Sequence, residues 1–220
     1  MRRIVGATFS TLDGVIQGPG GPSEDTTGGF RFSGWLPPVG DDAINEKIGE
    51  LFGGPFDLLL GRRTYEIFAG YWPYAPDEMA DIRDPFNACT KYVFTHREEP
   101  LEWQNSQRID IETLRELKQG EGPDLIIQGS STLYPPLLSA GLIDRLLLMT
   151  FPVLLGKGKS IFDVSQRPTR MKLTDHHVSD KGVVFTIYEP DGEVETGTFA
   201  TKEPSQAEIE LREKIREGAW

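Results

Sequence analysis

Two stretches of this chain join an apolar run to a glycine and to residues that can begin a helix. In the first, Phe56–Tyr65, the apolar run leads into Gly61, Arg62 and Arg63. A buried strand that ends on a glycine and turns into a helix presents free backbone N–H groups, and the positive end of the helix dipole, to an anion. The stretch therefore predicts a phosphate-binding turn with arginines beside it.

The second stretch, Asp124–Tyr134, repeats this order with an apolar run, Gly129 and a hydroxyl-rich run from Ser130 to Thr132. In a parallel α/β sheet both turns lie at the carboxyl ends of the strands, where ligands bind. We therefore expect a phosphate-bearing ligand between the two turns. Neither stretch matches the dinucleotide-binding fingerprint G-x-G-x-x-G or a Walker sequence. Two tight turns without a ligand remain the alternative interpretation.

Strands and helices alternate through the first two thirds of the chain, which predicts an α/β protein with a mostly parallel sheet covered by helices on both faces. After residue 150 the helical pattern stops, so we expect antiparallel strands at one edge of a mixed sheet. The expected strands are residues 3–9, 56–60, 91–95, 106–109, 124–128, 142–150, 152–155, 173–178 and 183–188. The expected helices are residues 41–52, 64–69, 77–87 and 111–119. A further helix is expected to begin in the hydroxyl-rich run after Gly129 and to end at Gly141.

Two segments fall outside this alternation. Gly18–Gly34 is rich in glycine, proline and hydroxyl residues and contains Phe30 and Phe32. A long loop with embedded aromatics in a compact domain favours a lid or a docking surface. From Asp191 onward the sequence is polar and acidic, with a charged helix expected near its end. We therefore predict a domain over residues 1–190 and a surface or partner-contacting extension over residues 191–220.

Charge and composition exclude several classes of protein. The formal net charge of −11 argues against binding to nucleic acid or to an anionic membrane, since both need a basic surface. No apolar run reaches the length of about 18 residues that a membrane span needs. The first residues are typical of a strand rather than a signal peptide. Cys89 is the only cysteine, which excludes an intrachain disulfide and suits a cytoplasmic protein.

Metal and hydrolase sites are disfavoured. His176 and His177 are adjacent in an expected strand and would point to opposite faces, so they do not chelate one ion easily. We expect no metal site. The Gly129-Ser130-Ser131 sequence lacks the second glycine of a nucleophile elbow, which disfavours a serine hydrolase.

Four short motifs, taken in their order along the chain, carry a family resemblance. They are Thr11–Gly14, Gly61–Glu66, Gln128–Leu133 and Leu155–Gly158. The ordered set resembles the dihydrofolate reductase-like superfamily, and specifically its branch of bacterial riboflavin-biosynthesis reductases with a RibD C-terminal domain. The resemblance extends over roughly residues 3–189 and implies a three-layer α/β fold.

The resemblance implies NADPH-dependent hydride transfer to a small heterocyclic or ribosylaminopyrimidine-like substrate, similar to 5-amino-6-(5-phosphoribosylamino)uracil reductase. On this chain it implies that Gly61, Arg62 and Thr64 hold the adenosine phosphates, while Arg63 lies on the solvated side of the helix start. Two residues would flank the 2′-phosphate, and a run of five would wrap the pyrophosphate. They are Thr95 and Arg97 for the 2′-phosphate, and Gly129, Ser130, Ser131, Thr132 and Leu133 for the pyrophosphate.

At the substrate end, Asp13 is the candidate catalytic carboxylate, and a turn residue ahead of Gly14 is its equally open alternative. Folate reductases hold their ring with an acidic helix residue that has no clear counterpart here, because Glu46 and Glu50 are expected to be solvated. Dihydrofolate is therefore disfavoured, and a general carbonyl or quinone reductase or a non-catalytic dinucleotide-binding protein stays open. The zinc deaminase half of many riboflavin-pathway enzymes is absent, so this chain would perform only the reduction.

Members of this branch are commonly dimers. We expect a homodimer in which the apolar segment Leu142–Leu155 and the appended C-terminal strands bury against a second copy. A strict monomer in sedimentation would contradict this expectation.

Overall fold

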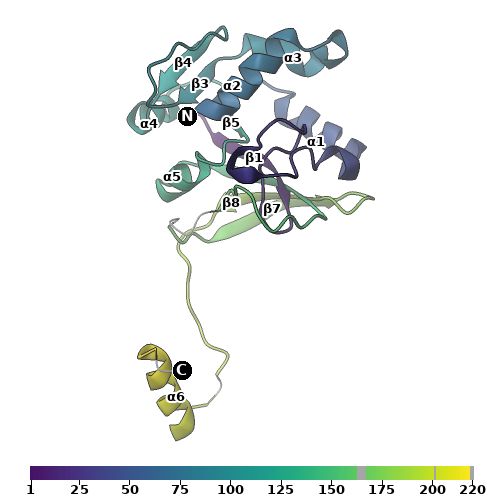
Figure 1. Ribbon diagram of the computed structural model, residues 1–220. Coiled ribbons are helices and arrows are strands. Elements are labelled where there is room, and N and C mark those ends of the chain that lie inside the picture. Colours follow the sequence, from purple (N-terminus) through teal and green to yellow (C-terminus); the bar gives the residue numbers. More distant parts are fainter. Residues whose placement is uncertain (163–166, 201, 219–220) are drawn as a thin grey trace.

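A single sheet organises the protein. The computed structural model describes residues 1–162, 167–200 and 202–218, and in these residues eight strands have the order β4-β3-β2-β5-β1-β6-β8-β7 (Figure 1). The strands are β1 Ile4–Thr11, β2 Phe56–Gly61, β3 Lys91–Phe94, β4 Ser106–Ile109, β5 Asp124–Gln128, β6 Arg145–Phe151, β7 Met171–Val178 and β8 Val184–Pro190. The neighbours from β4 to β6 pair in parallel, and β8 and β7 continue the sheet antiparallel. The mixed, mostly parallel sheet with an antiparallel C-terminal edge is thus confirmed.

Helices cover both faces of the sheet, which gives three layers. The helices are α1 Asp42–Phe52, α2 Arg62–Tyr71, α3 Ala80–Ala88, α4 Ile111–Gln119, α5 Tyr134–Ser139 and α6 Gln206–Arg216. Strand β2 shows how the sequence builds the layers, because successive strand residues point to opposite faces. Leu59 packs in a buried cluster with α4 and α5, whereas Leu58 and Leu60 pack in a second cluster with α2 and α3. All three leucines are buried, so a continuous apolar run suits this strand.

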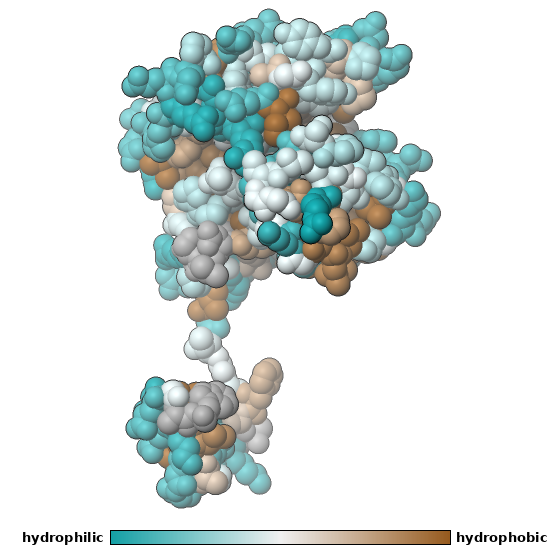
Figure 2. All heavy atoms as spheres, in the orientation of Figure 1, coloured by the Kyte–Doolittle hydropathy of each residue, from teal (hydrophilic) through white to brown (hydrophobic). Residues whose placement is uncertain are grey.

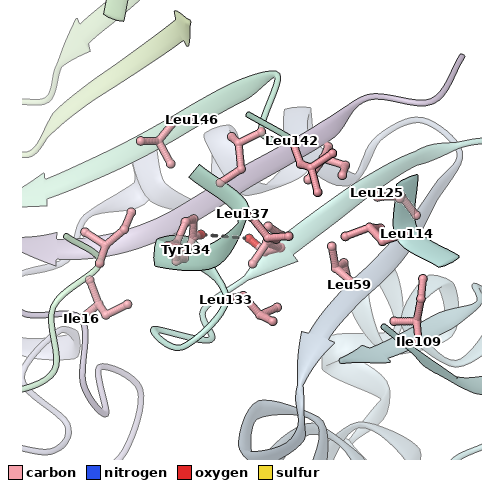
Figure 3. Close-up of a cluster of buried hydrophobic side chains, with 14 residues drawn as sticks. Ile16, Leu59, Ile109, Leu114, Leu125, Leu133, Tyr134, Leu137, Leu142 and Leu146 are labelled. Carbon is pink, nitrogen blue, oxygen red and sulfur yellow. Dashed lines mark hydrogen bonds between the residues drawn. The ribbon is translucent and has the colours of Figure 1, made fainter. Parts of the chain in front are cut away.

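Tyr134 anchors α5 against the central strands β1 and β5 and lies in a buried apolar cluster (Figure 3). The residue is completely buried, and its hydroxyl donates a hydrogen bond of 3.2 Å to the carbonyl of Ala7. Its ring requires a glycine on β1, because a Cβ at Gly6 would lie 2.7 Å from the Tyr134 ring. This close packing fixes the start of α5, and with it the end of the turn that follows β5.

Three differences from the sequence-based expectation concern the turns at the carboxyl ends of the strands. Helix α2 begins at Arg62 rather than Thr64, directly after Gly61. Helix α5 begins at Tyr134 and not within the hydroxyl-rich run, because Gly129 and Ser130 have φ values of 76° and 64°, outside the right-handed helical region.

The expected strand at 152–155 is the third difference, since these residues form no strand. Pro152 has no N–H to donate to a ladder. The segment is held instead by single hydrogen bonds to the turn after β1, including one of 2.9 Å from the N–H of Leu12 to the carbonyl of Val153.

The C-terminal helix α6 lies apart from the sheet in Figure 1, and none of its residues is buried. Ser205 caps it by accepting a hydrogen bond from the N–H of Glu208. Its exposed apolar side chains include Ile209, Leu211 and Ile215, which lie among charged side chains (Figure 2). The division at residue 190 stays a prediction. None of the helices in the described part of the chain is long and apolar enough to cross a membrane.

Candidate functional site

The two glycine turns predicted to bind phosphate are joined in space by hydrogen bonds. Gly61 is the residue before the first turn of α2, and its N–H donates to the Oγ of Ser130 at 2.9 Å. The Ser130 hydroxyl in turn donates to the Oγ1 of Thr64 at 2.8 Å. A Cβ on Gly61 would lie 3.3 Å from the Ser130 hydroxyl, so glycine allows this close approach.

Ser130 adopts an unusual conformation for a residue with a side chain. Its φ of 64° is in the left-handed region, where strain is characteristically found at functional sites. The conformation places the hydroxyl between the two turns, where it accepts from Gly61 and donates to Thr64. The turn after β5 is therefore held against the first turn of α2.

A cavity of about 990 Å³ opens beside these turns, at the carboxyl ends of β1, β2 and β5. Its volume is at the upper end of the range for small-molecule and cofactor sites. Eight of the residues predicted to bind the cofactor line it, namely Gly61, Arg62, Thr64, Arg97, Gly129, Ser130, Ser131 and Thr132.

The cavity wall combines an apolar part with many polar and charged groups. Phe9, Ile44, Ile48 and Phe68 contribute side chains from β1, α1 and α2. Gln128 ends β5 in the same cavity, and its Oε1 is buried without a hydrogen-bond partner among the described residues. A buried unpaired acceptor is costly to the folded state, and this oxygen has almost no exposed surface toward the cavity.

Two residues predicted to contact the cofactor do not line the cavity. Leu133 is 1% exposed and belongs to the core beneath the sheet, while its N–H donates to the carbonyl of Ser130 at 2.8 Å. This backbone hydrogen bond closes the turn. The Leu133 side chain packs in the apolar core instead of the cavity. The Oγ1 of Thr95 accepts from the N–H of Arg97 at 3.1 Å, so Thr95 orients the start of the following loop.

Asp13 lies in the exposed turn after β1 and is not among the residues that line the cavity. Its carboxylate accepts hydrogen bonds from the Thr11 hydroxyl and from the N–H groups of Gly156, at 2.6 Å, and Leu155. The bond from Thr11, with those from the two backbone groups, holds the pKa of Asp13 below its usual value. This geometry favours the turn interpretation, with Asp13 tying the β1 turn to the 155–156 turn.

The loop over residues 18–34 is anchored to the cavity by an ionic cluster. Asp25 accepts hydrogen bonds from Lys159 and from the Thr27 hydroxyl, and lies 3.5 Å from Arg63. Burial opposes the ionisation of Asp25, but the bonds from Lys159 and Thr27 outweigh it and lower its pKa to about 2. Arg63 also lines the cavity, while its side chain is 55% exposed, as expected for the solvated side of the helix start.

Comparison with models of known protein families identifies the family of this chain. A model described as the RibD C-terminal domain matches residues 2–185. The chain belongs to the RibD C-terminal domain family. The matched residues include every strand of the sheet apart from the end of β8, and every residue of the site described above.

Individual relatives of this RibD C-terminal domain are distant in sequence. The uncharacterized protein YyaP of Bacillus subtilis strain 168 is 27% identical over 196 residues, which cover 87% of this chain and 96% of YyaP. A protein assigned to riboflavin biosynthesis from Shewanella sp. PV-4 has a TM-score of 0.64 at 17% identity, covering 86% and 99% of the two chains. Dihydrofolate reductase from Enterococcus faecalis, complexed with NADP(H) and RAB-propyl, has a TM-score of 0.54 at 16% identity, covering 86% and 96%. The dihydrofolate reductase-like fold is thus confirmed.

Sequence reasoning missed Asp25 and Lys159 of this RibD C-terminal domain. The two side chains pair across 134 residues of sequence, and no local pattern indicates which partner a charged loop residue has. The unusual length of the loop over residues 18–34 was the available signal, because long loops in compact domains commonly serve binding.

Replacing Asp25 with asparagine is expected to remove a pH-dependent part of the stability. The folded-state pKa of Asp25 is depressed, so its contribution is complete above the pKa of an unfolded aspartate, about 3.9. It is lost as the pH falls through about 2. Melting temperatures should therefore be higher for the wild type than for D25N near neutral pH, and the two curves should converge toward about pH 2. Parallel curves would contradict this role of the carboxylate.

Proposed function

We propose that this protein is an NADPH-dependent reductase that transfers hydride to a small heterocyclic or ribosylaminopyrimidine-like substrate. The observation that carries the proposal is the hydrogen-bonded pair of turns, Gly61–Thr64 and Gly129–Thr132, at the side of a cavity of about 990 Å³. Free N–H groups at the start of α2 and the cavity-lining Arg62 and Arg97 suit the phosphates of a dinucleotide.

Local charge makes such a polyanion acceptable on a protein with a net charge of −11. Arg62 donates to Glu66 at 2.7 Å and to the carbonyl of Glu99 at 3.1 Å. A guanidinium has five N–H donors, so Arg62 is oriented by these two bonds and keeps donors for a phosphate. Arg97 lines the same cavity and forms no ion pair within the described ranges.

The apolar part of the cavity suits the reacting rings. NADPH, when bound, supplies the hydride. Phe9, Ile48 and Phe68 exclude water from a ring placed between α1 and α2. The protein's part in the reaction is thus to hold the two rings face to face in an apolar space.

NADPH should raise the melting temperature of the wild type by mass action. Arg62→Ala should reduce that shift, because a charge-assisted hydrogen bond to phosphate is lost. Arg212→Ala is the matched control, since Arg212 also pairs with a glutamate four residues away but lies on α6. Wild-type protein that shows no shift with any dinucleotide would remove the proposal.

A dinucleotide-binding protein without turnover is the second candidate. It is supported by the same turns, and it differs in predicting a melting shift without consumption of cofactor. Loss of NADPH absorbance with ribosylaminopyrimidine, dihydrofolate, quinone or carbonyl substrates separates the two. Oxidation of NADPH by one of these classes also selects the substrate.

The homodimer stays a prediction, and its expected surface comprises the Leu142–Leu155 segment and the appended C-terminal strands. Leu142, Ile143 and most side chains of β6 are already buried within one copy. Strand β7 lies at the open edge of the sheet and is exposed along most of its length, including Leu173 and Val178. We propose β7 rather than the Leu142–Leu155 segment as the surface for a second copy.

A further inference from the structure

Glu24 lies in the loop over residues 18–34 and lines the cavity beside the apolar wall. Hydrogen bonds within the protein hold the loop around Glu24 in place. The N–H of Gly34 donates to the carbonyl of Gly18 at 2.7 Å, and the indole of Trp35 donates to the carbonyl of Gln17 at 3.0 Å. The Asp25 cluster fixes the next residue along the chain. The position of Glu24 is therefore set before any ligand binds.

One oxygen of the Glu24 carboxyl is used by the loop itself. The N–H groups of Gly20 and Gly21 both donate to Oε2, at 2.6 and 3.1 Å. No donor among the described residues bonds to Oε1. Because the two backbone bonds hold the carboxyl in place, the second oxygen is available as an oriented acceptor in the cavity.

The charge of Glu24 is also uncompensated. The other acidic groups that line the cavity have basic partners, since Asp25 pairs with Lys159 and Arg63, and Glu66 pairs with Arg62. Glu24 forms no ion pair within the described ranges. Burial raises the pKa of its carboxyl, against the two backbone bonds, and the neighbouring charge of Asp25 adds to the rise. A cationic or N–H-bearing ligand group would relieve this cost.

We propose that Glu24 binds the substrate directly, with its carboxyl accepting hydrogen bonds from the amino and ring N–H groups of an aminopyrimidine-type heterocycle. The inference rests on the proposed function, which already includes an aminopyrimidine-like ring, and deepens it by naming the residue that recognises the N–H groups of that ring. Apolar side chains around the cavity suit the faces of a planar ring, whereas the Glu24 carboxyl suits its polar edge. Specificity then follows from the buried polar groups, which an apolar ring of the same size leaves unpaired.

Binding of 2,4-diaminopyrimidine, measured by calorimetry in the presence of NADPH, tests this role. The wild type should bind this probe, and Glu24→Gln should weaken binding at least about tenfold, because a charge-assisted pair is lost. Glutamine retains an oxygen for the N–H groups of Gly20 and Gly21, so the loop should persist. Glu46→Gln removes the same charge from the exposed face of α1 and should leave binding unchanged.

A second probe keeps the test independent of the variant. Unsubstituted pyrimidine has the ring but no amino groups, so the wild type should bind it far more weakly than 2,4-diaminopyrimidine. Equal binding of the two probes, equal binding of 2,4-diaminopyrimidine by the wild type and E24Q, or no binding of it by the wild type would overturn the role of Glu24. The NADPH-induced melting shift of the wild type reports on the proposed function separately, and E24Q should keep that shift.

Discussion

Replacing Asp57 with alanine is expected to lower the free energy of unfolding by about 3–5 kcal/mol, as is typical when one partner of a buried ion pair is removed. Asp57 stands near the start of β2 and pairs with Arg2, whose side chain is 3% exposed. Its other oxygen accepts from the N–H of Thr90 at 2.9 Å. The variant leaves the Arg2 guanidinium buried without its carboxylate. Urea denaturation of both proteins measures the difference.

Asp124→Ala is the matched control for this prediction. Asp124 lies opposite Phe56 on the neighbouring strand β5 and pairs with Arg3. The Arg3 side chain is 54% exposed, so this pair should contribute less than about 1 kcal/mol. Equal losses in the two variants would contradict the argument from burial. Replacing Arg2 and Asp57 together with apolar residues should recover part of the stability, because no unpaired charge is left.

Arg97→Ala is expected to lower the affinity for NADPH at least about tenfold, by loss of a charged hydrogen-bond donor to phosphate. The residue follows β3, lines the cavity and was predicted from the sequence to flank the 2′-phosphate. NADH has no 2′-phosphate, so its affinity should not change. Calorimetric titration with both cofactors measures the two effects.

Arg108→Ala provides the control for Arg97. Arg108 lies on the neighbouring strand β4, donates to the carbonyl of Glu99 at 3.1 Å and does not line the cavity. It should leave the affinities for both cofactors unchanged. An equal loss of NADPH and NADH affinity in Arg97→Ala would place Arg97 elsewhere on the cofactor.

Much of the fold was predictable because it rests on local patterns. The apolar run of β2 had to be covered on both faces, and its three central leucines are all buried. The period of Ile111, Leu114 and Leu117 matches the face that α4 packs on the core. The glycines that follow the apolar runs mark the ends of β2 and β5, because the chain must turn there.

The details of the site were less predictable because they depend on contacts between distant residues. Leu133 was expected at the pyrophosphate, but the core beneath the sheet takes its side chain. Asp13 was weighed as a catalytic group, and the turn at residues 155–156 binds its carboxylate. In both cases the residue type allows two roles, and the contact that favours one of them comes from a neighbour far away in the sequence or inside the core. Both functional roles stay predictions.

The sequence by itself determined that two strand-glycine turns with nearby arginines would share one edge of an α/β sheet, because strand direction and apolar period are local properties. Only the tertiary structure decided that Ser130 joins those turns through Gly61 and Thr64. Likewise it decided that Glu24 faces the same cavity. These contacts join segments that lie far apart in the sequence, and their energy depends on burial and on partners that no single stretch of sequence contains.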